Sequence, residues 1–231
     1  MAELPIHYSE VESVYSQTIG ANYRTVAVTS AAPGEGKSML AEALVRRAEA
    51  AQKKVLLVEM NTFNPALKEK LQSLSQQPFK KNKIMAVGND GMSFLSAPSN
   101  ASAIATYRET NLLIEEINKW LENFDCIIFD TASLAMRNQH NIPAESICQV
   151  CDGTIMLVEA GRTPANLIEE GINKLSTRRV NIVGTVINDR TNPTLLTELV
   201  RETRKFDRYV PKLMSKIRSK LEKMILLKVS I

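Results

Sequence analysis

The chain has 231 residues, 44% of them hydrophobic, and carries a formal net charge of +4 at pH 7. This length suits one α/β domain with a buried core, with or without an added terminal element. The sequence contains no long uncharged apolar run, and its first residues, MAELPIHYSE, are polar and acidic. We therefore expect neither a membrane-spanning helix nor a secretory signal. Three cysteines and two histidines argue against a structural zinc site and suit a reducing cytoplasm.

Apolar runs and helical patterns alternate along the chain. Short runs of apolar and β-branched residues predict six strands, over residues 24–30, 55–59, 94–96, 126–130, 153–158 and 180–187. Helical spacing of apolar residues predicts helices over residues 37–51, 103–123 and 164–176. The polar segment 72–90 is expected to be a surface loop. Because buried strands separated by helices are typical of parallel sheets, we expect an α/β fold with three layers and a mostly parallel sheet.

The stretch TSAAPGEGKS, residues 29–38, connects the first predicted strand to the first predicted helix. In a phosphate-binding loop, glycines let backbone amides surround phosphate oxygens, a lysine meets the β and γ phosphates, and a hydroxyl binds magnesium. The pattern therefore predicts a nucleotide site made by Pro33, Gly34, Glu35, Gly36, Lys37, Ser38 and Met39. The usual first glycine of the motif is Ala31 here. The competing interpretation is a glycine-containing turn in which Lys37 is merely solvated.

Several short motifs together resemble one family. TSAAPGEGKS is followed by KKVLLVE, with Pro65 six residues after the last glutamate, and later by FDCIIFDT, DGTIMLVE and GTVIN. This combination, over about residues 10–192, resembles the bacterial tyrosine kinases of capsule and exopolysaccharide synthesis, the BY-kinases. Their broader relatives are the ParA/MinD-type deviant-Walker ATPases, whose signature lysine would fall at Ala32. The resemblance implies a P-loop NTPase fold that binds ATP or ADP with Mg²⁺.

The resemblance also implies roles for single residues. Lys37 would contact the phosphates, Ser38 and Asp130 would lie around magnesium, and Asn188 would read the adenine edge. Glu59 would act as an activating carboxylate or hold a magnesium-bound water, which makes Lys37, Glu59 and Asp130 the candidate catalytic residues. Three competing interpretations stay open. Glu59 caps a neighbouring helix, Asp130 caps or forms a salt bridge at its strand end, and Asn188 is an ordinary turn residue.

The segment 59–65 departs from the family's Walker A′ pattern, Asp-x-Asp-x-Arg-x-Pro. It has Glu59, Asn61 and Phe63 at the three charged positions. One tyrosine, Tyr209, follows residue 187, where the family usually has a tyrosine cluster, and the segment 12–18 lacks both arginines of the family's assembly motif. Autophosphorylation and the ring-shaped oligomer therefore do not follow from the resemblance, although a homo-oligomer stays open.

These motifs predict an ATP-binding domain of an exopolysaccharide or capsule system, with ATPase or tyrosine-kinase-like phosphotransferase activity. The implied partner is a transmembrane polysaccharide co-polymerase or a similar membrane protein. One alternative is a catalytically degenerate nucleotide-binding scaffold that regulates a membrane complex. Another is a MinD/ParA-like positioning ATPase. The carboxylate of Glu59 favours the enzyme, whereas the neutral Asn61 favours the scaffold.

The end of the chain is strongly basic. Residues 201–231 contain ten Lys and Arg against three Asp and Glu, so residues 1–200 have a net charge of −3. From Pro211 onward, six apolar residues follow one stripe of a helix: Leu213, Met214, Ile217, Leu221, Met224 and Ile225. Such a helix packs on its own domain, lies on an anionic membrane or fills a partner's groove.

The density of lysines favours a membrane surface for residues 211–231. Nucleic acid is disfavoured, because no aromatic residues interleave with these charges. We expect three parts, an N-terminal segment 1–23, a P-loop domain 24–200 and a basic amphipathic helix 201–231. The protein is expected to be cytoplasmic and peripheral at the inner face of the plasma membrane.

Overall fold

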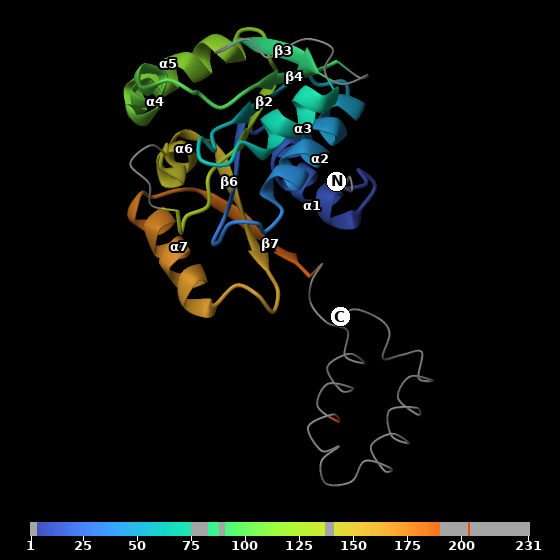
Figure 1. Ribbon diagram of the computed structural model, residues 1–231. Coiled ribbons are helices and arrows are strands. Elements are labelled where there is room, and N and C mark those ends of the chain that lie inside the picture. The colour runs from blue at the N-terminus through green and yellow to red at the C-terminus, as the bar shows by residue number, and fades with distance from the viewer. Residues whose placement is uncertain (1–3, 75–82, 88–90, 137–140, 190–202, 204–231) are drawn as a thin grey trace. The chain divides into compact units, whose positions relative to one another are not determined.

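The computed structural model describes residues 4–74, 83–87, 91–136, 141–189 and 203 of the chain (Figure 1). The chain divides into two compact units, one made of Met1–Val158 and Thr163–Ile187 and the other of Glu159–Arg162 and Asn188–Ile231. Most of the described residues belong to the first unit. None of the helices in the described ranges has the length and apolar character needed to cross a membrane.

Seven strands form one mostly parallel sheet. Their bounds are β1 Thr25–Ser30, β2 Val55–Glu59, β3 Ile84–Val87, β4 Met92–Leu95, β5 Cys126–Asp130, β6 Gly153–Glu159 and β7 Ile182–Asn188. The strand order is β3-β4-β2-β5-β1-β6-β7. β1 pairs in parallel with β5 and β6, and β2 pairs in parallel with β4 and β5. The predicted α/β fold with a mostly parallel sheet is confirmed.

Helices cover both faces of this sheet (Figure 1). They are α1 Ser9–Gln17, the short 3₁₀ helix Ile19–Ala21, α2 Lys37–Ala50, α3 Ala66–Leu74, α4 Ala101–Arg108, α5 Thr110–Leu121, α6 Ala144–Val150 and α7 Ala165–Thr177. Alternate residues of a strand face opposite sides. Val26 and Val28 of β1 therefore join the core cluster with α1, α2 and α3, while Ala27 joins the cluster with α4, α5, α6 and α7. These two core clusters confirm the three layers.

The single helix predicted over residues 103–123 is wrong. The chain forms α4 and α5 instead, and the break lies at Glu109, whose backbone is extended with φ −79° and ψ 113°. The Glu109 N–H still bonds to the carbonyl oxygens of Ala105 and Thr106, so α4 ends with satisfied acceptors. The apolar spacing continues across the break, which is why the pattern suggested one helix.

The loop predicted over residues 72–90 is also wrong in part. α3 extends to Leu74, and residues 84–87 form β3, an edge strand that pairs antiparallel with β4. β3 is an apolar run of only four residues, IMAV, inside a polar segment, and its first residue, Ile84, is 39% exposed. The pattern also missed the helices α1, α3 and α6 and the short 3₁₀ helix. The other predicted elements lie within two residues of the observed bounds.

Gly153 permits the close packing of β6 against its surroundings. A Cβ atom at Gly153 would lie 2.6 Å from both Tyr23 Cε2 and Val183 Cγ2. We expect Gly153→Ala to lower the free energy of unfolding by about 1–3 kcal/mol, because overpacking forces neighbours to shift. Gly184→Ala is the matched control, since a Cβ atom there would meet nothing within 4 Å. Urea unfolding of both variants measures the difference, and equal stabilities would contradict the packing argument.

Candidate functional site

The predicted phosphate-binding loop connects the end of β1 to the start of α2. Gly34 and Gly36 have positive φ angles, 87° and 97°, which glycine adopts at little cost. Gly36 directly precedes α2, and its carbonyl oxygen accepts hydrogen bonds from the N–H groups of Met39 and Leu40. Anions are attracted to such a helix start, because the first amides of a helix have no acceptor within it. Pro33 is exposed at the loop.

Lys37 is the first residue of α2, and only 7% of it is exposed. Burial lowers the pKa of its ammonium group, and the negative charges of Asp130 and Glu35 oppose this shift. A buried ammonium needs such nearby negative charge to offset its desolvation. Lys37 is therefore not the solvated lysine of the competing interpretation, and its role at the phosphates stays a prediction.

Asp130 ends β5 and lies beside the start of α2. Its Oδ2 accepts a hydrogen bond from Ser38 Oγ at 2.6 Å. Its Oδ1 is buried and has no hydrogen-bond partner within the part of the chain that the structure describes. Burial raises the pKa of Asp130, while the charge of Lys37 and the bond from Ser38 lower it. A buried acceptor without a partner is costly unless a ligand, water or ion meets it.

The oxygens of Ser38 and Asp130 form a donor set that suits Mg²⁺, which prefers oxygen ligands and keeps several waters. Across the described ranges, no group of three or more His, Cys, Asp and Glu side chains comes together as a metal cluster. A magnesium ion held here would therefore take most of its ligands from phosphate oxygens and water.

Glu59 ends β2, directly opposite Asp130 in the register of β2 and β5. It is fully buried, and both carboxylate oxygens are hydrogen-bonded: Oε1 accepts from the N–H of Leu67 at 2.8 Å and Oε2 from that of Lys68 at 3.2 Å. These amides lie in the first turn of α3, so Glu59 caps this helix. Burial, with the charge of Asp130, raises the pKa of Glu59 to about 8. The helix-cap interpretation describes this geometry, and a catalytic role stays a prediction.

Asn61 shapes the turn that follows β2. Its Nδ2 donates to the carbonyl oxygen of Asn64 at 2.9 Å, and its Oδ1 accepts from the N–H of Asn64 at 3.2 Å. Thr62 Oγ1 donates to Asn141 Oδ1 at 2.8 Å, which ties the turn to the residues before α6. Phe63, between them, is 62% exposed. The bonds between Asn61 and Asn64 join a side chain to the backbone, which is common in turns.

Glu35 and Asn188 are the two remaining residues of the predicted site. Glu35, predicted as one of the nucleotide-binding loop residues, is 1% exposed, and its carboxylate accepts hydrogen bonds from the N–H of Ala32 and the hydroxyl of Thr163. No local sequence signal indicates the contact with Thr163. Asn188 ends β7 and belongs to the second unit, so its role at the adenine edge stays a prediction.

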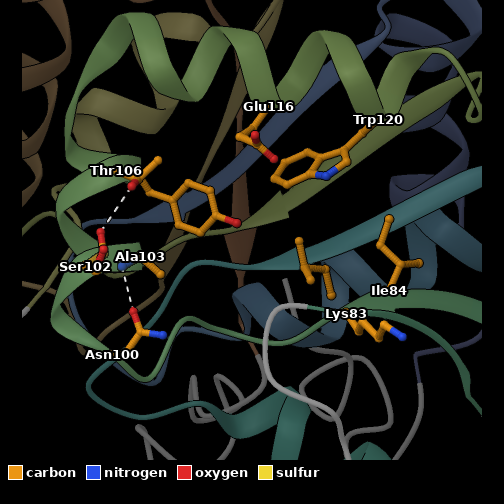
Figure 2. A pocket seen from close by; sticks show the side chains of 10 residues that line it. Lys83, Ile84, Asn100, Ser102, Ala103, Thr106, Glu116 and Trp120 are labelled. Atoms are coloured by element: carbon orange, nitrogen blue, oxygen red, sulfur yellow. Dashed lines mark hydrogen bonds between the residues drawn. The ribbon is translucent and has the colours of Figure 1, made fainter.

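A cavity of about 490 Å³ lies elsewhere in the first unit, between β3 and β4 on one side and α4 and α5 on the other (Figure 2). Glu116 and Trp120 of α5 line it, together with Tyr107 of α4. The ring centroids of Tyr107 and Trp120 are 6.2 Å apart. None of its lining residues belongs to the phosphate-binding loop, so this cavity is separate from the nucleotide site.

The raised pKa of Glu59 makes stability depend on pH. Between pH 4.5 and 8 the unfolded chain loses this proton while the folded protein keeps it, so stability falls as pH rises through this window. We expect Glu59→Gln to remove about 3 to 4 kcal/mol of the decrease in unfolding free energy between pH 5 and pH 8. Urea unfolding in EDTA at both pH values measures this. The exposed Glu122→Gln is the control, and the same pH slope in Glu59→Gln and wild type would contradict the assignment.

Comparison with known proteins finds relatives at about a quarter sequence identity. The chain is 24% identical over 186 residues to the succinoglycan biosynthesis transport protein ExoP of Rhizobium meliloti and 25% identical over 187 residues to the tyrosine-protein kinase CpsD of Streptococcus agalactiae. It is also 25% identical over 180 residues to the tyrosine-protein kinase YwqD of Bacillus subtilis. These matches cover 73%, 74% and 72% of this chain, and 22%, 77% and 73% of the respective relatives. No family model matches the chain.

Solved structures share the fold at low sequence identity. The kinase domain of Escherichia coli tyrosine kinase ETK has a TM-score of 0.62 at 15% identity, covering 81% of each chain. The BceF tyrosine kinase domain has a TM-score of 0.60 at 19% identity, covering 77% of this chain and 74% of that one. Cobyrinic acid a,c-diamide synthase from Mycobacterium smegmatis, with bound ADP and magnesium, has a TM-score of 0.57 at 17% identity, covering 81% and 83%. The predicted P-loop NTPase fold is confirmed.

The sequence matches and the fold agree with the order of motifs along the chain. The matched relatives include named tyrosine kinases, and the fold neighbours include tyrosine kinase domains. The departures at Glu59, Asn61 and Phe63 lie within this shared framework. The chain is therefore similar in sequence to named bacterial tyrosine kinases, and it shares the fold of solved tyrosine kinase domains.

Proposed function

We propose that this chain binds ATP or ADP with Mg²⁺ as the nucleotide-binding domain of an exopolysaccharide or capsule system. The observation that carries the proposal is the buried Lys37 at the start of α2, next to Asp130, whose Oδ1 is buried without a partner among the described residues. Phosphate and magnesium would satisfy both groups, because they bring negative charge to the ammonium and positive charge to the carboxylate.

Each residue around the loop would have a separate role in binding. Gly34 and Gly36 let the backbone approach the phosphates closely, and Lys37 would offset their charge. Ser38 and Asp130 would hold the magnesium ion, which supplies charge neutralisation when bound. The fold neighbour from Mycobacterium smegmatis binds ADP and magnesium on the same kind of fold, which supports the proposal. Asn188 would contact the adenine, as the family resemblance suggests.

A second function, a nucleotide-responsive scaffold with little turnover, is favoured by Glu59. Its two carboxylate oxygens already accept amides of α3, and its pKa of about 8 favours the neutral form at pH 7. A neutral, hydrogen-bonded acid is a poor activating carboxylate. Asn61 brings no charge either, since its side chain forms a turn with Asn64. Both observations support binding without efficient tyrosine phosphorylation.

The proposed partner is a transmembrane polysaccharide co-polymerase or a similar membrane protein, and the proposed location is the inner face of the plasma membrane. ExoP is named a biosynthesis transport protein for a polysaccharide, and this chain matches 22% of its length. The basic segment 211–231 would add attraction to anionic lipid, at about 1 kcal/mol for each basic residue near the surface. That segment lies outside the described residues.

We expect Lys37→Met to weaken binding of Mg-ATP at least tenfold, because the variant keeps the side-chain length and removes the charge that faces the phosphates. Isothermal titration calorimetry measures the dissociation constant, and circular dichroism confirms folding. Lys53→Met, at an exposed lysine, is the control. Equal affinities of wild type and Lys37→Met would contradict the proposed site. Phosphate release in the same samples separates the two functions, because Lys37-dependent turnover would reject the scaffold.

We expect deletion of residues 211–231 to reduce sedimentation with vesicles of anionic phospholipid and to leave sedimentation with neutral vesicles unchanged. The segment carries six Lys and Arg against one Glu, so the attraction should weaken as salt rises. Replacement of Lys212, Lys216 and Lys220 by Gln keeps the length and apolar stripe and should have the same effect. Unchanged sedimentation of both variants would reject the membrane role.

A further inference from the structure

Glu35 is an acidic residue buried inside the proposed phosphate-binding loop. It is 1% exposed and lies between Gly34 and Gly36, the two loop glycines with positive φ. A carboxylate at this place is unexpected, because it would repel phosphate and because burying a charge is costly without partners. The two hydrogen bonds that the Glu35 carboxylate accepts explain why an acidic residue lies here.

The first bond fixes the shape of the loop. Glu35 Oε2 accepts from the N–H of Ala32 at 2.9 Å, which closes the turn that contains Pro33 and Gly34. The carbonyl oxygen of Ala32 accepts from Ser30 Oγ at 2.7 Å. Side chains therefore bond to both the N–H and the carbonyl oxygen of Ala32.

The second bond anchors the loop to a distant part of the chain. Glu35 Oε1 accepts from the hydroxyl of Thr163, 128 residues further on. Thr163 directly precedes Pro164, the N-cap residue of α7. The bond therefore ties the loop before α2 to the residues that lead into α7.

The charge of Glu35 is also offset locally. The negative charges of Asp130 and Glu35 both act on the buried ammonium of Lys37 and favour its charged form. The acid therefore helps to keep a lysine charged in a buried position, where an incoming phosphate meets it.

We propose that Glu35 is a positioning residue of the nucleotide site and that Thr163 anchors it, so that the loop has its phosphate-accepting shape before nucleotide binds. This inference rests on the proposed nucleotide function. A preformed loop does not lose conformational freedom at the moment of binding, which improves affinity without any added contact to the ligand.

The test compares Thr163→Val, which removes the hydroxyl at nearly constant size, with Thr163→Ser, which keeps it. We expect Thr163→Val to raise the dissociation constant of Mg-ADP about three- to tenfold, the effect of losing one hydrogen bond to a charged group. Thr163→Ser should bind as wild type does. Thr185→Val, at an exposed threonine of β7, is the control. In a Glu35→Ala background, Thr163→Val should add nothing further.

Hydrogen exchange of the Ala32 amide without nucleotide tests the loop directly. We expect faster exchange in Thr163→Val and Glu35→Ala, and the wild-type rate in Thr163→Ser. A lower melting temperature of Thr163→Val with unchanged affinity and unchanged Ala32 exchange would overturn the inference, because it would show a role in stability alone. A wild-type protein that binds no nucleotide would instead overturn the proposed function, and the Ala32 exchange rates would still decide the role of Glu35 in the loop.

Discussion

The places of Asp130 and Glu59 beside the loop depend on the parallel backbone pairing of β1 with β5 and of β5 with β2. This pairing sets Val28 beside Asp130 and sets Glu59 opposite Asp130, so three strands end at one edge of the sheet. The loop then leaves β1 at that edge and starts α2 with Lys37. Ends of parallel strands are the usual place for ligands in α/β sheets, because the loops there are free to vary.

The site holds more buried charge than an apolar core tolerates. Lys37, Glu35 and Asp130 are each less than a tenth exposed, and Glu59 is fully buried. The four groups are not equivalent. Lys37 and Asp130 offset each other, Glu35 is held by hydrogen bonds, and Glu59 is driven toward its neutral form by burial and by Asp130. Because these charges are offset before any ligand binds, the site needs little rearrangement to accept a ligand.

The sequence predicted the inner strands and the loop well because their signals are local. Residues 55–59 and 126–130 are continuous apolar runs, and both strands have the predicted bounds. β3 was missed because its apolar run, residues 84–87, is only four residues long and lies inside a polar segment. The contacts that define the site were beyond local patterns. Glu59 meets the start of α3, and Glu35 meets Thr163 across 128 residues, so only the folded topology brings them together.

The break at Glu109 also has a geometric consequence for the layer that covers β5. An unbroken helix over residues 103–123 would be about 30 Å long at 1.5 Å per residue. The five residues of β5 span about 17 Å. A single straight rod would therefore project beyond the sheet, whereas two shorter helices change direction at Glu109. Arg108, just before the break, donates from Nε to the carbonyl oxygen of Asn141 at 3.0 Å and so ties this layer to the residues before α6.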